Sequence, residues 1–341
     1  MTAVVFDNVS IVFGNKPQIA LPLMDQGQDR AEVKEATEQV LGVHNCSLTV
    51  EEGEILVLMG LSGSGKSTLL RAVNGLNPVV RGRVLVNDGN EMADVTNASD
   101  ATLRHLRQKR VAMVFQQFGL LPWRSVRENV GLGLELAGLP AKERDAQVEQ
   151  QLDLVGLSDW ADRPVSDLSG GMQQRVGLAR AFATEAPILL MDEPFSALDP
   201  LIRNRLQDEL LELQRKLGRT IIFVSHDLDE AFKLGDRIAI MDGGRIVQCG
   251  TPQEIFTDPA TDYVADFVAH MNPLGVLRAS DVLEPPTDDD FAATVELDAS
   301  IQEVMQAAHD VHAPVAVEKD GKLVGRITRN GILGKLLDPR Q

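Results

Sequence analysis

The chain has 341 residues, 44% of them hydrophobic, and carries a formal net charge of −17. That length suggests two domains, each able to bury a core of its own. The acidic balance and the lack of a clustered Lys/Arg stretch argue against nucleic acid as a main partner, because contact with a phosphate backbone needs a basic surface.

Cysteine usage and hydropathy indicate the cellular compartment in which the protein is expected to work. The only cysteines, Cys46 and Cys249, lack the spacing of a metal site and fit small core residues in a reducing cytoplasm. The N-terminus has no charged-then-apolar signal pattern, and no apolar run approaches the length of a membrane span. We therefore expect any membrane role to depend on a partner protein.

The predicted elements of residues 1–270 form an α/β domain. A loosely alternating edge strand covers residues 4–13, and an insertion over residues 15–40 contains a helix-prone stretch at 29–39. Strands are expected at residues 46–50, 54–59, 84–86, 111–115, 188–191, 220–224 and 237–241, and helices at residues 69–73, 100–110 and 206–217. Most of the later strands are continuous apolar runs, typical of a parallel sheet. Leu-rich stretches at residues 130–137 and 146–155 predict a helical subdomain over about residues 118–168.

A smaller α/β domain is expected within residues 271–341. Its linker includes the acidic, Pro-containing loop 284–290. The pattern that follows is helix, strand, Gly turn, strand and helix, at residues 301–309, 315–317, 320–321, 323–327 and 332–337.

The central motif lies between the apolar run 54–59 and the helix at 69–73. It consists of Gly60, Leu61, Ser62, Gly63, Ser64, Gly65, Lys66, Ser67 and Thr68. Strand, G-x-x-x-x-G-K-S and helix is the arrangement of a phosphate-binding loop, in which glycines let backbone N–H groups surround a phosphate. Lys66 is expected to reach the β and γ phosphates and Ser67 to ligate Mg²⁺. An ordinary Gly-rich turn is the alternative, which the flanking elements disfavour.

Two acids end the apolar run 188–191. In such a position Asp192 is expected to hold the Mg²⁺ shell, and Glu193 to act as general base on an attacking water. Two solvated acids at the end of a strand are a poorer explanation beside a phosphate-binding loop.

Further motifs follow in a fixed order, and together they resemble ATP-binding-cassette (ABC) ATPases. Ser169, Gly170 and Gly171 open a predicted helix and match the family's signature. Gln116 resembles its Q-loop glutamine, Asp199 its D-loop, and His226 its switch histidine.

The resemblance covers residues 4–270 and implies ATP and Mg²⁺ as cofactors. Two cassettes pair head to tail, so ATP on the phosphate loop of one subunit is completed by Ser169, Gly170 and Gly171 of the other. Gln173 and Asp199 are also assigned to the nucleotide, and Gln116 joins Ser67 and Asp192 at Mg²⁺. The resemblance implies catalytic roles for Glu193, His226, Lys66 and Gln116. Phe13 is the candidate for stacking on adenine, while a buried strand Phe remains an equal explanation.

A narrower resemblance links the motifs to the ATPases of glycine betaine, proline and choline importers, with the choline importer ATPase as the nearest type. It implies a homodimer that powers uptake of a quaternary amine with membrane permease subunits and, indirectly, a periplasmic binding protein. The chain would then lie peripherally on the cytoplasmic face of the inner membrane. Residues 118–129 would contact the permease, or simply pack the helical subdomain. Aromatic residues are 4% of the chain and scattered, so substrate contacts are expected in other subunits.

Two alternatives remain, an importer for another small solute and a soluble ABC ATPase of translation or repair. The short distance in sequence between Gln116 and Ser169 leaves no room for long coiled coils, and with the acidic charge it favours the transporter.

The C-terminal segment resembles a single CBS repeat. Gly325 and Thr328 approximate that family's Gly-x-x-Thr-x-x-Asp element, but the position of its ribose-binding Asp is not acidic, and Asn330 stands nearest to it. This departure argues against adenosine binding. A regulatory or dimerising role and a passive tail both remain open.

Overall fold

The computed structural model describes residues 1–116, 119–269, 271–287, 290–308 and 313–337. Backbone contacts divide the chain into two units, Met1–His226 with Ala239–Ile246, and Asp227–Ile238 with Val247–Gln341. The functional boundary after residue 270 stays a prediction.

A six-stranded sheet with the order β10-β9-β3-β8-β7-β6 carries the central motif. Its strands are β3 (Ile55–Met59), β6 (Val111–Val114), β7 (Ile188–Asp192), β8 (Thr220–Val224), β9 (Arg237–Asp242) and β10 (Arg245–Gly250). Neighbours among β3, β8, β7 and β6 are parallel, and every residue of β3, β7 and β8 is buried. The apolar runs thus form strands that are buried on both faces of the sheet, as predicted, and their carboxyl ends meet at one edge of the sheet.

A second sheet has the order β2-β1-β4-β5. It contains β1 (Thr2–Phe13), β2 (Val40–Glu51), β4 (Arg81–Asn87) and β5 (Met92–Asp94). The prediction of an edge strand over residues 4–13 was wrong, because β1 pairs antiparallel with both β2 and β4. Register shifts along β1 bring consecutive residues 9–12 into buried positions, so the weak alternation came from bulges rather than from an exposed edge.

The insertion after β1 folds into short helices, with η1 at Pro17–Ala20, α1 at Leu21–Asp25 and α2 at Arg30–Thr37. Asp29 caps α2, and Glu32 completes a capping box with the Asp29 backbone N–H, which explains where this helix begins. Met24 and Val33 are fully buried in a small apolar cluster with residues of β1 and β2. The helix expected at 29–39 is confirmed, and the cluster fixes it on the sheet.

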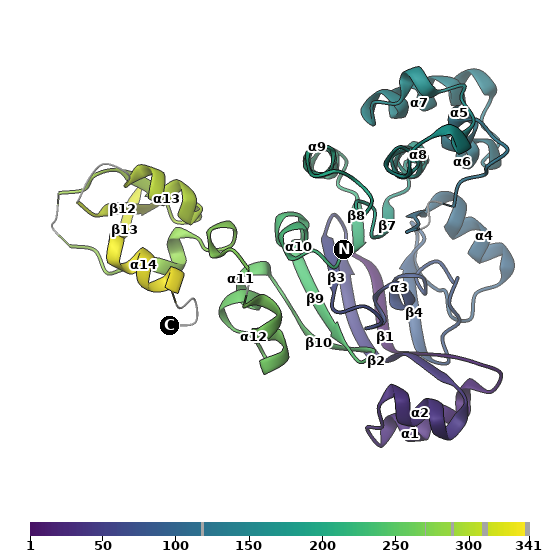
Figure 1. The fold of residues 1–341 in the computed structure, drawn as a ribbon, viewed down its shortest axis with the longest axis horizontal. Helices are drawn as coiled ribbons and strands as arrows, with labels where there is room; N and C mark the ends of the chain where they lie inside the picture. The colour runs from purple at the N-terminus through teal and green to yellow at the C-terminus, as the bar shows by residue number, and fades with distance from the viewer. Residues whose placement is uncertain (117–118, 270, 288–289, 309–312, 338–341) are drawn as a thin grey trace. The chain divides into compact units, whose positions relative to one another are not determined.

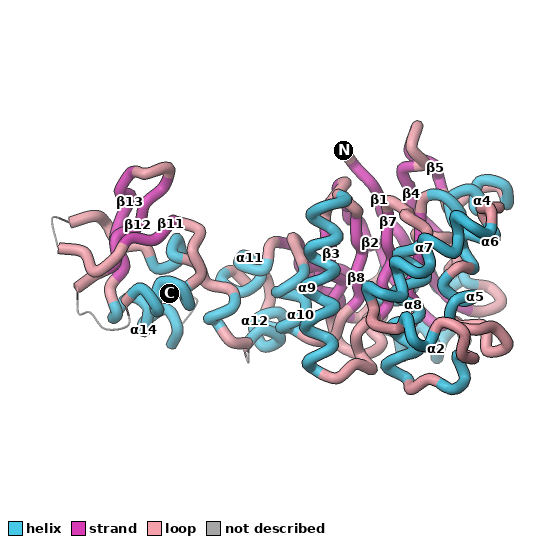
Figure 2. The backbone as a smooth tube through the Cα atoms, turned by 90° about the horizontal axis from the view of Figure 1, so that it is seen from above, coloured by secondary structure: helices cyan, strands magenta, loops and turns pink. Residues whose placement is uncertain are grey.

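Helices complete the first unit. They are α3 (Lys66–Leu70), α4 (Asp100–Lys109), α5 (Val126–Val130), α6 (Leu132–Leu136), α7 (Ala141–Leu154), α8 (Gly170–Ala183) and α9 (Pro200–Leu217), with 3₁₀ turns η2 (Ser158–Trp160) and η3 (Val165–Asp167). The single helix expected at 130–137 is instead split between α5 and α6 at Gly131. Figure 1 groups α5 to α8 together, and Figure 2 shows α7 and α8 side by side, in agreement with their packing. The helical cluster therefore includes α8, which follows the predicted limit of 168.

The second unit contains α10 (Leu228–Leu234), α11 (Pro252–Thr257), α12 (Asp262–Val268), η4 (Pro273–Gly275), η5 (Ala279–Val282), β11 (Thr294–Glu296), α13 (Ile301–Ala307), β12 (Val315–Lys319), β13 (Lys322–Ile327) and α14 (Arg329–Leu337). A three-stranded sheet has the order β11-β12-β13. The predicted succession of elements is confirmed, except that residue 309 of the first helix lies outside the described residues and β11 was not expected. The pairs β11–β12 and β12–β13 are parallel and antiparallel, respectively.

Candidate functional site

The loop between β3 and α3 is pressed so closely on its surroundings that glycine is required. Gly60 has φ +139°, and a Cβ there would lie 2.1 Å from the Met241 carbonyl oxygen. Gly65 has φ +105°, with the Gly42 carbonyl oxygen 2.6 Å from an added Cβ. Both positions exclude L side chains by conformation and by space. The helix expected at 69–73 begins earlier, at Lys66, and is regular only as far as Leu70.

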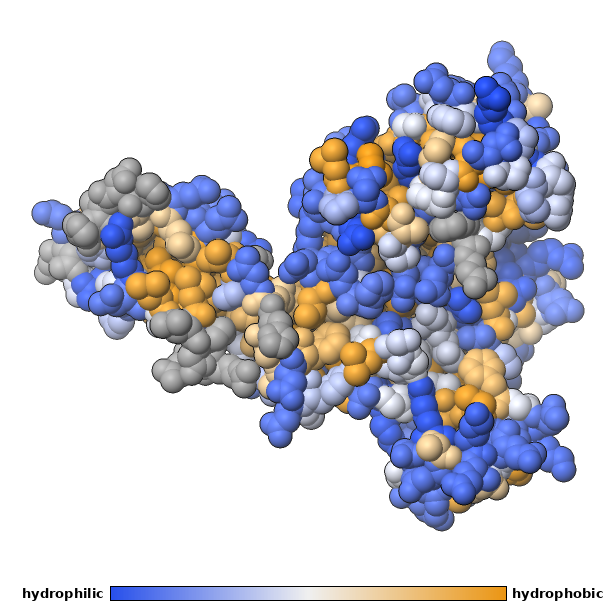
Figure 3. All heavy atoms as spheres, in the orientation of Figure 1, coloured by the Kyte–Doolittle hydropathy of each residue, from blue (hydrophilic) through white to orange (hydrophobic). Residues whose placement is uncertain are grey.

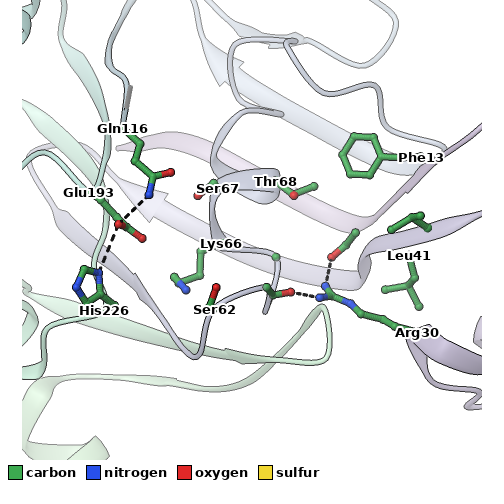
Figure 4. Close-up of a pocket in the computed structure, with 14 residues that line it drawn as sticks. Phe13, Arg30, Leu41, Ser62, Lys66, Ser67, Thr68, Gln116, Glu193 and His226 are labelled. Carbon is green, nitrogen blue, oxygen red and sulfur yellow. Dashed lines mark hydrogen bonds and ion pairs between the residues drawn. The ribbon is translucent and has the colours of Figure 1, made fainter. Parts of the chain in front are cut away.

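A cavity of about 530 Å³ opens over this loop (Figure 4). Ten of the residues singled out in the sequence line it, namely Phe13, Ser62, Gly63, Gly65, Lys66, Ser67, Thr68, Gln116, Glu193 and His226. Arg30, Val40, Leu41 and Gly42, which the sequence did not indicate, complete the lining. Phe13 is 37% exposed, so it is not the buried strand residue of the alternative explanation. Its role against adenine stays a prediction.

Lys66 is held by the start of its own loop. The Nζ atom donates to the carbonyl oxygens of Gly60 at 2.8 Å and Leu61 at 3.0 Å. Burial lowers the pKa of Lys66, and the nearby carboxylates of Glu193 and Asp192 oppose that shift. An anionic phosphate in the cavity would give this ammonium the counter-charge that favours its protonated form.

Asp192 is fully buried at the end of β7. The Ser67 hydroxyl donates to its Oδ1 at 2.6 Å, and Arg71 Nη2 lies 2.8 Å from its Oδ2. The sequence had paired Ser67 with Asp192 but had missed Arg71. Arg71 follows Ser67 by four residues and so lies on the same face of the short helix, a spacing that could have indicated it.

Glu193 directly follows Asp192 in the chain and lines the cavity. Its backbone has φ +49°, a left-handed conformation that costs a non-glycine residue about 1–3 kcal/mol. Gln116 Nε2 donates to Glu193 Oε2 at 3.0 Å, and His226 Nδ1 lies 3.4 Å from the same oxygen. Three side chains that follow β6, β7 and β8 thus converge at the carboxyl edge of the sheet (Figure 4).

The signature residues lie outside the cavity lining. Ser169 caps α8 by accepting from the Met172 N–H, and Gln173 donates to the carbonyls of Val165 and Leu168. Asp199 likewise caps α9. Within one chain, these predicted nucleotide ligands therefore do not meet the phosphate-binding loop.

Gln174, which the sequence analysis did not single out, connects the signature helix to the acidic edge. It is 1% exposed, donates to the Glu193 carbonyl at 3.2 Å and accepts from the Ala197 N–H at 3.1 Å. No compositional signal marks it, because a buried glutamine is recognised only from its partners.

Both parts of the chain match families of known proteins. A family model described as ABC transporter matches residues 43–196, and one described as CBS domain matches residues 279–338. The glycine betaine/proline betaine transport system ATP-binding protein ProV of Escherichia coli K12 is 52% identical over 81% of this chain and 68% of its own length. The glycine betaine/carnitine transport ATP-binding protein GbuA of Listeria monocytogenes is 38% identical over 98% of both chains.

This chain belongs to the ATP-binding proteins of ABC transporters. A bacterial ABC transporter cassette solved as a dimer superposes with a TM-score of 0.63 at 29% identity, covering 73% of this chain and 98% of that one. The predicted fold, a P-loop cassette followed by a CBS domain, is confirmed, as is ATPase membership. In the described part of the chain, no helix is long and apolar enough to cross a membrane.

Proposed function

We propose that this cassette is the ATP-hydrolysing subunit of an importer that takes up an osmoprotectant quaternary amine through partner permease subunits. The observation that carries the proposal is the convergence of Gln116, Glu193 and His226 over the phosphate-binding loop.

In this proposal each side chain around the loop has a distinct task. Lys66 binds the β and γ phosphates, and the backbone of residues 60–68 surrounds them. Glu193 accepts a proton from the attacking water, while His226 and Gln116 orient its carboxylate through Oε2. The reaction thereby depends on positioning and charge stabilisation rather than on a covalent intermediate.

The oxygen donors beside the loop fit Mg²⁺. The Ser67 hydroxyl and the Asp192 carboxylate lie 2.6 Å apart, and hard oxygen donors with few protein ligands are what this ion accepts when a nucleotide supplies the rest. Among the described residues, no group of three or more His, Cys, Asp and Glu side chains could hold a metal ion. The Gln116 amide oxygen is the proposed third protein donor. The bound ion would neutralise charge on the phosphates.

A dimer is part of the proposal, because Ser169, Gly170 and Gly171 lie outside the cavity of their own chain. In this proposal the exposed first turn of α8, together with Gln173 and Asp199, completes the nucleotide site of a second cassette. Leu201 is 79% exposed at the start of α9, as expected for a surface that a partner covers.

The helical subdomain offers the proposed permease contact. Trp123 is 77% exposed, and the preceding Leu121 is half-buried, with both its backbone groups bonded to the side chain of the buried Asn129. Close by in sequence, Phe115 and Gly119 line a largely apolar cavity of about 330 Å³ with Leu132 and Leu136. These apolar surfaces suit a permease helix. Phe118, part of the predicted contact, lies outside the described residues.

The substrate group follows the relatives. Their names refer to glycine betaine, proline betaine and carnitine, and a further relative from Ruegeria pomeroyi, 42% identical, is a trimethylamine N-oxide transport ATP-binding protein. Glycine betaine and choline are the proposed candidates, with choline supported only by the resemblance in the motifs.

The CBS domain is proposed to regulate or to dimerise. Hydrophobic side chains gather on it in Figure 3, and Leu323 and Leu333 are 44% and 56% exposed. Thr328 donates to Glu284 and accepts from the Gly331 N–H, so its hydroxyl has partners other than a ribose. Truncation after residue 275 tests the role, since unchanged transport and an unchanged response to salt would exclude regulation.

The decisive experiment reconstitutes the cassette with its permease and binding protein and measures ATPase activity with choline, glycine betaine, proline and taurine. Stimulation by glycine betaine or choline is expected. Glu193→Gln should bind ATP and lose turnover, whereas Lys66→Ala should bind ATP weakly. Glu212→Gln, on the exposed face of α9, is the matched control. A reconstituted complex whose ATPase activity is not stimulated by any of these solutes would refute the substrate group, and wild-type turnover in Glu193→Gln would refute the assigned base.

A further inference from the structure

Helix α2 of the insertion places a positively charged side chain in the wall of the nucleotide cavity. Arg30 is the first residue of α2 and lines the cavity, on the side of Phe13 and Leu41 (Figure 4). The capping box formed by Asp29 and Glu32 fixes the start of this helix, and the buried Val33 anchors it. The position of the Arg30 guanidinium is thus set by a folded element rather than by a free loop.

The guanidinium joins two backbone segments that are distant in sequence. Nη1 donates to the carbonyl oxygen of Gly63, in the phosphate-binding loop, and Nη2 donates to that of Gly42, in β2, at 2.6 Å. A Cβ added to Gly65 would lie 3.4 Å from Nη2. The loop, β2 and Arg30 are therefore in close contact, and Arg30 fastens the outer side of the loop to the strand.

Arg30 also contributes charge. Among the described residues that line the cavity, the Lys and Arg side chains are those of Lys66 and Arg30. Burial lowers the pKa of Arg30, and Asp242 opposes that shift, but an arginine remains charged in proteins. A polyphosphate in the cavity would meet Lys66 on one side of the loop and Arg30 beside its outer turn.

We propose that Arg30 is a positioning residue for nucleotide binding, which ties the phosphate-binding loop to β2 and adds a second permanent positive charge to the cavity wall. The inference rests on ATP binding, as the proposed function does, and concerns the affinity of this site. Arg30 acts through the loop and makes no contact with Glu193 or His226 that would alter the chemical step. Its loss should therefore raise the Kd and KM for ATP and leave kcat nearly unchanged.

The test titrates the full chain with a fluorescent ATP analogue at several salt concentrations and measures KM and kcat for ATP. Arg30→Met should weaken binding about tenfold or more, because it removes a positive charge from the cavity wall and the charged hydrogen bonds that hold the phosphate-binding loop in place. Arg30→Lys should recover part of the affinity, because an ammonium keeps the charge and reaches one carbonyl. The weakening of binding by salt should be smaller in Arg30→Met than in the wild type. Lys34→Met removes a charge from the exposed side of the same helix and should bind as the wild type does.

Two results would overturn the inference. One is an Arg30→Met protein whose affinity and KM stay within twofold of the wild type. The other is a fall in kcat with KM unchanged, together with a lower Tm, which indicates a structural role only. If Arg30→Met does not fold, Arg30→Gln is judged by the same criteria. Failure of the folded wild type to bind ATP would instead refute the proposed function, with Lys66→Ala as the reference for lost binding.

Discussion

The ion pair between Arg71 and Asp192 should couple strongly, because its carboxylate is buried. The two side chains are 36% and 0% exposed, and their N–O distance is 2.8 Å. Arg83 and Asp7 form a pair of the same length, but these side chains are 57% and 38% exposed. The two pairs therefore differ in solvation and not in separation, which makes the second a matched control for the first.

The expected coupling follows from what each substitution leaves behind. Arg71→Met keeps an apolar stem but deprives Asp192 Oδ2 of its charged donor, while Ser67 still donates to Oδ1. Removing one partner of a fully buried pair costs 3–5 kcal/mol, and about a third of the Arg71 side chain remains in water. We therefore expect a coupling free energy of about 2 kcal/mol between Arg71→Met and Asp192→Asn. The Arg83→Met and Asp7→Asn cycle should show no measurable coupling.

Urea unfolding followed by tryptophan fluorescence measures this coupling. Both tryptophans, Trp123 and Trp160, lie in the first unit, so their signal reports the unit that contains the two ion pairs. The four proteins of each cycle are compared without nucleotide. Equal coupling in the two pairs, or a value near zero for Arg71 and Asp192, would refute the argument from burial.

Two further substitutions test the loop and the core with the same fluorescence assay. Gly60→Ala should destabilise the first unit by about 3–5 kcal/mol, because its Cβ would meet the Met241 carbonyl at φ +139°. Gly27→Ala, at φ +84° with open space around it, should cost only about 1–2 kcal/mol, and equal costs would contradict the steric argument. Burial raises the pKa of Cys46 from 9.0 to about 11, so the folded state keeps the thiol proton that the unfolded chain releases. The associated stability is present below pH 9 and should fall by up to about 3 kcal/mol as pH rises to 11, a slope that Cys46→Ala should lack.

The sequence was sufficient where one local pattern determines one structure. Buried parallel strands such as β7 are continuous apolar runs and could be predicted, and the helix-prone stretch that begins at residue 29 located α2, although its Asp29 cap was not singled out. The edge assignment of β1 failed because bulges change the side-chain period along the strand, and pairing with β4 depends on residues far away in the chain. The split between α5 and α6 was missed because Gly131 interrupts a pattern that remains apolar on both sides.

The candidate site shows the same division between local and distant information. Residues of the loop and of the strand ends were identified because their motifs are contiguous. Arg30 and Gln174 were not, since each acts on backbone groups that only the fold brings near. Arg30 reaches Gly63 from an insertion, and Gln174 reaches the Glu193 carbonyl from the signature helix. Such side chains have no spacing rule, and only their partners in space identify them.

Gln174 also links the two halves of the nucleotide chemistry within one chain. The signature helix begins at residues that lie outside the cavity, yet its fifth residue holds both the Glu193 carbonyl and the Ala197 N–H. Glu193 in turn is held in a left-handed conformation beside Gln116 and His226. A displacement of α8 would therefore pull on the backbone of the proposed base through a buried amide, with no side chain of the cavity wall needed between them. In the proposed dimer, this contact is a direct physical route by which a nucleotide bound against the signature of one cassette would bias the position of Glu193 in that same cassette.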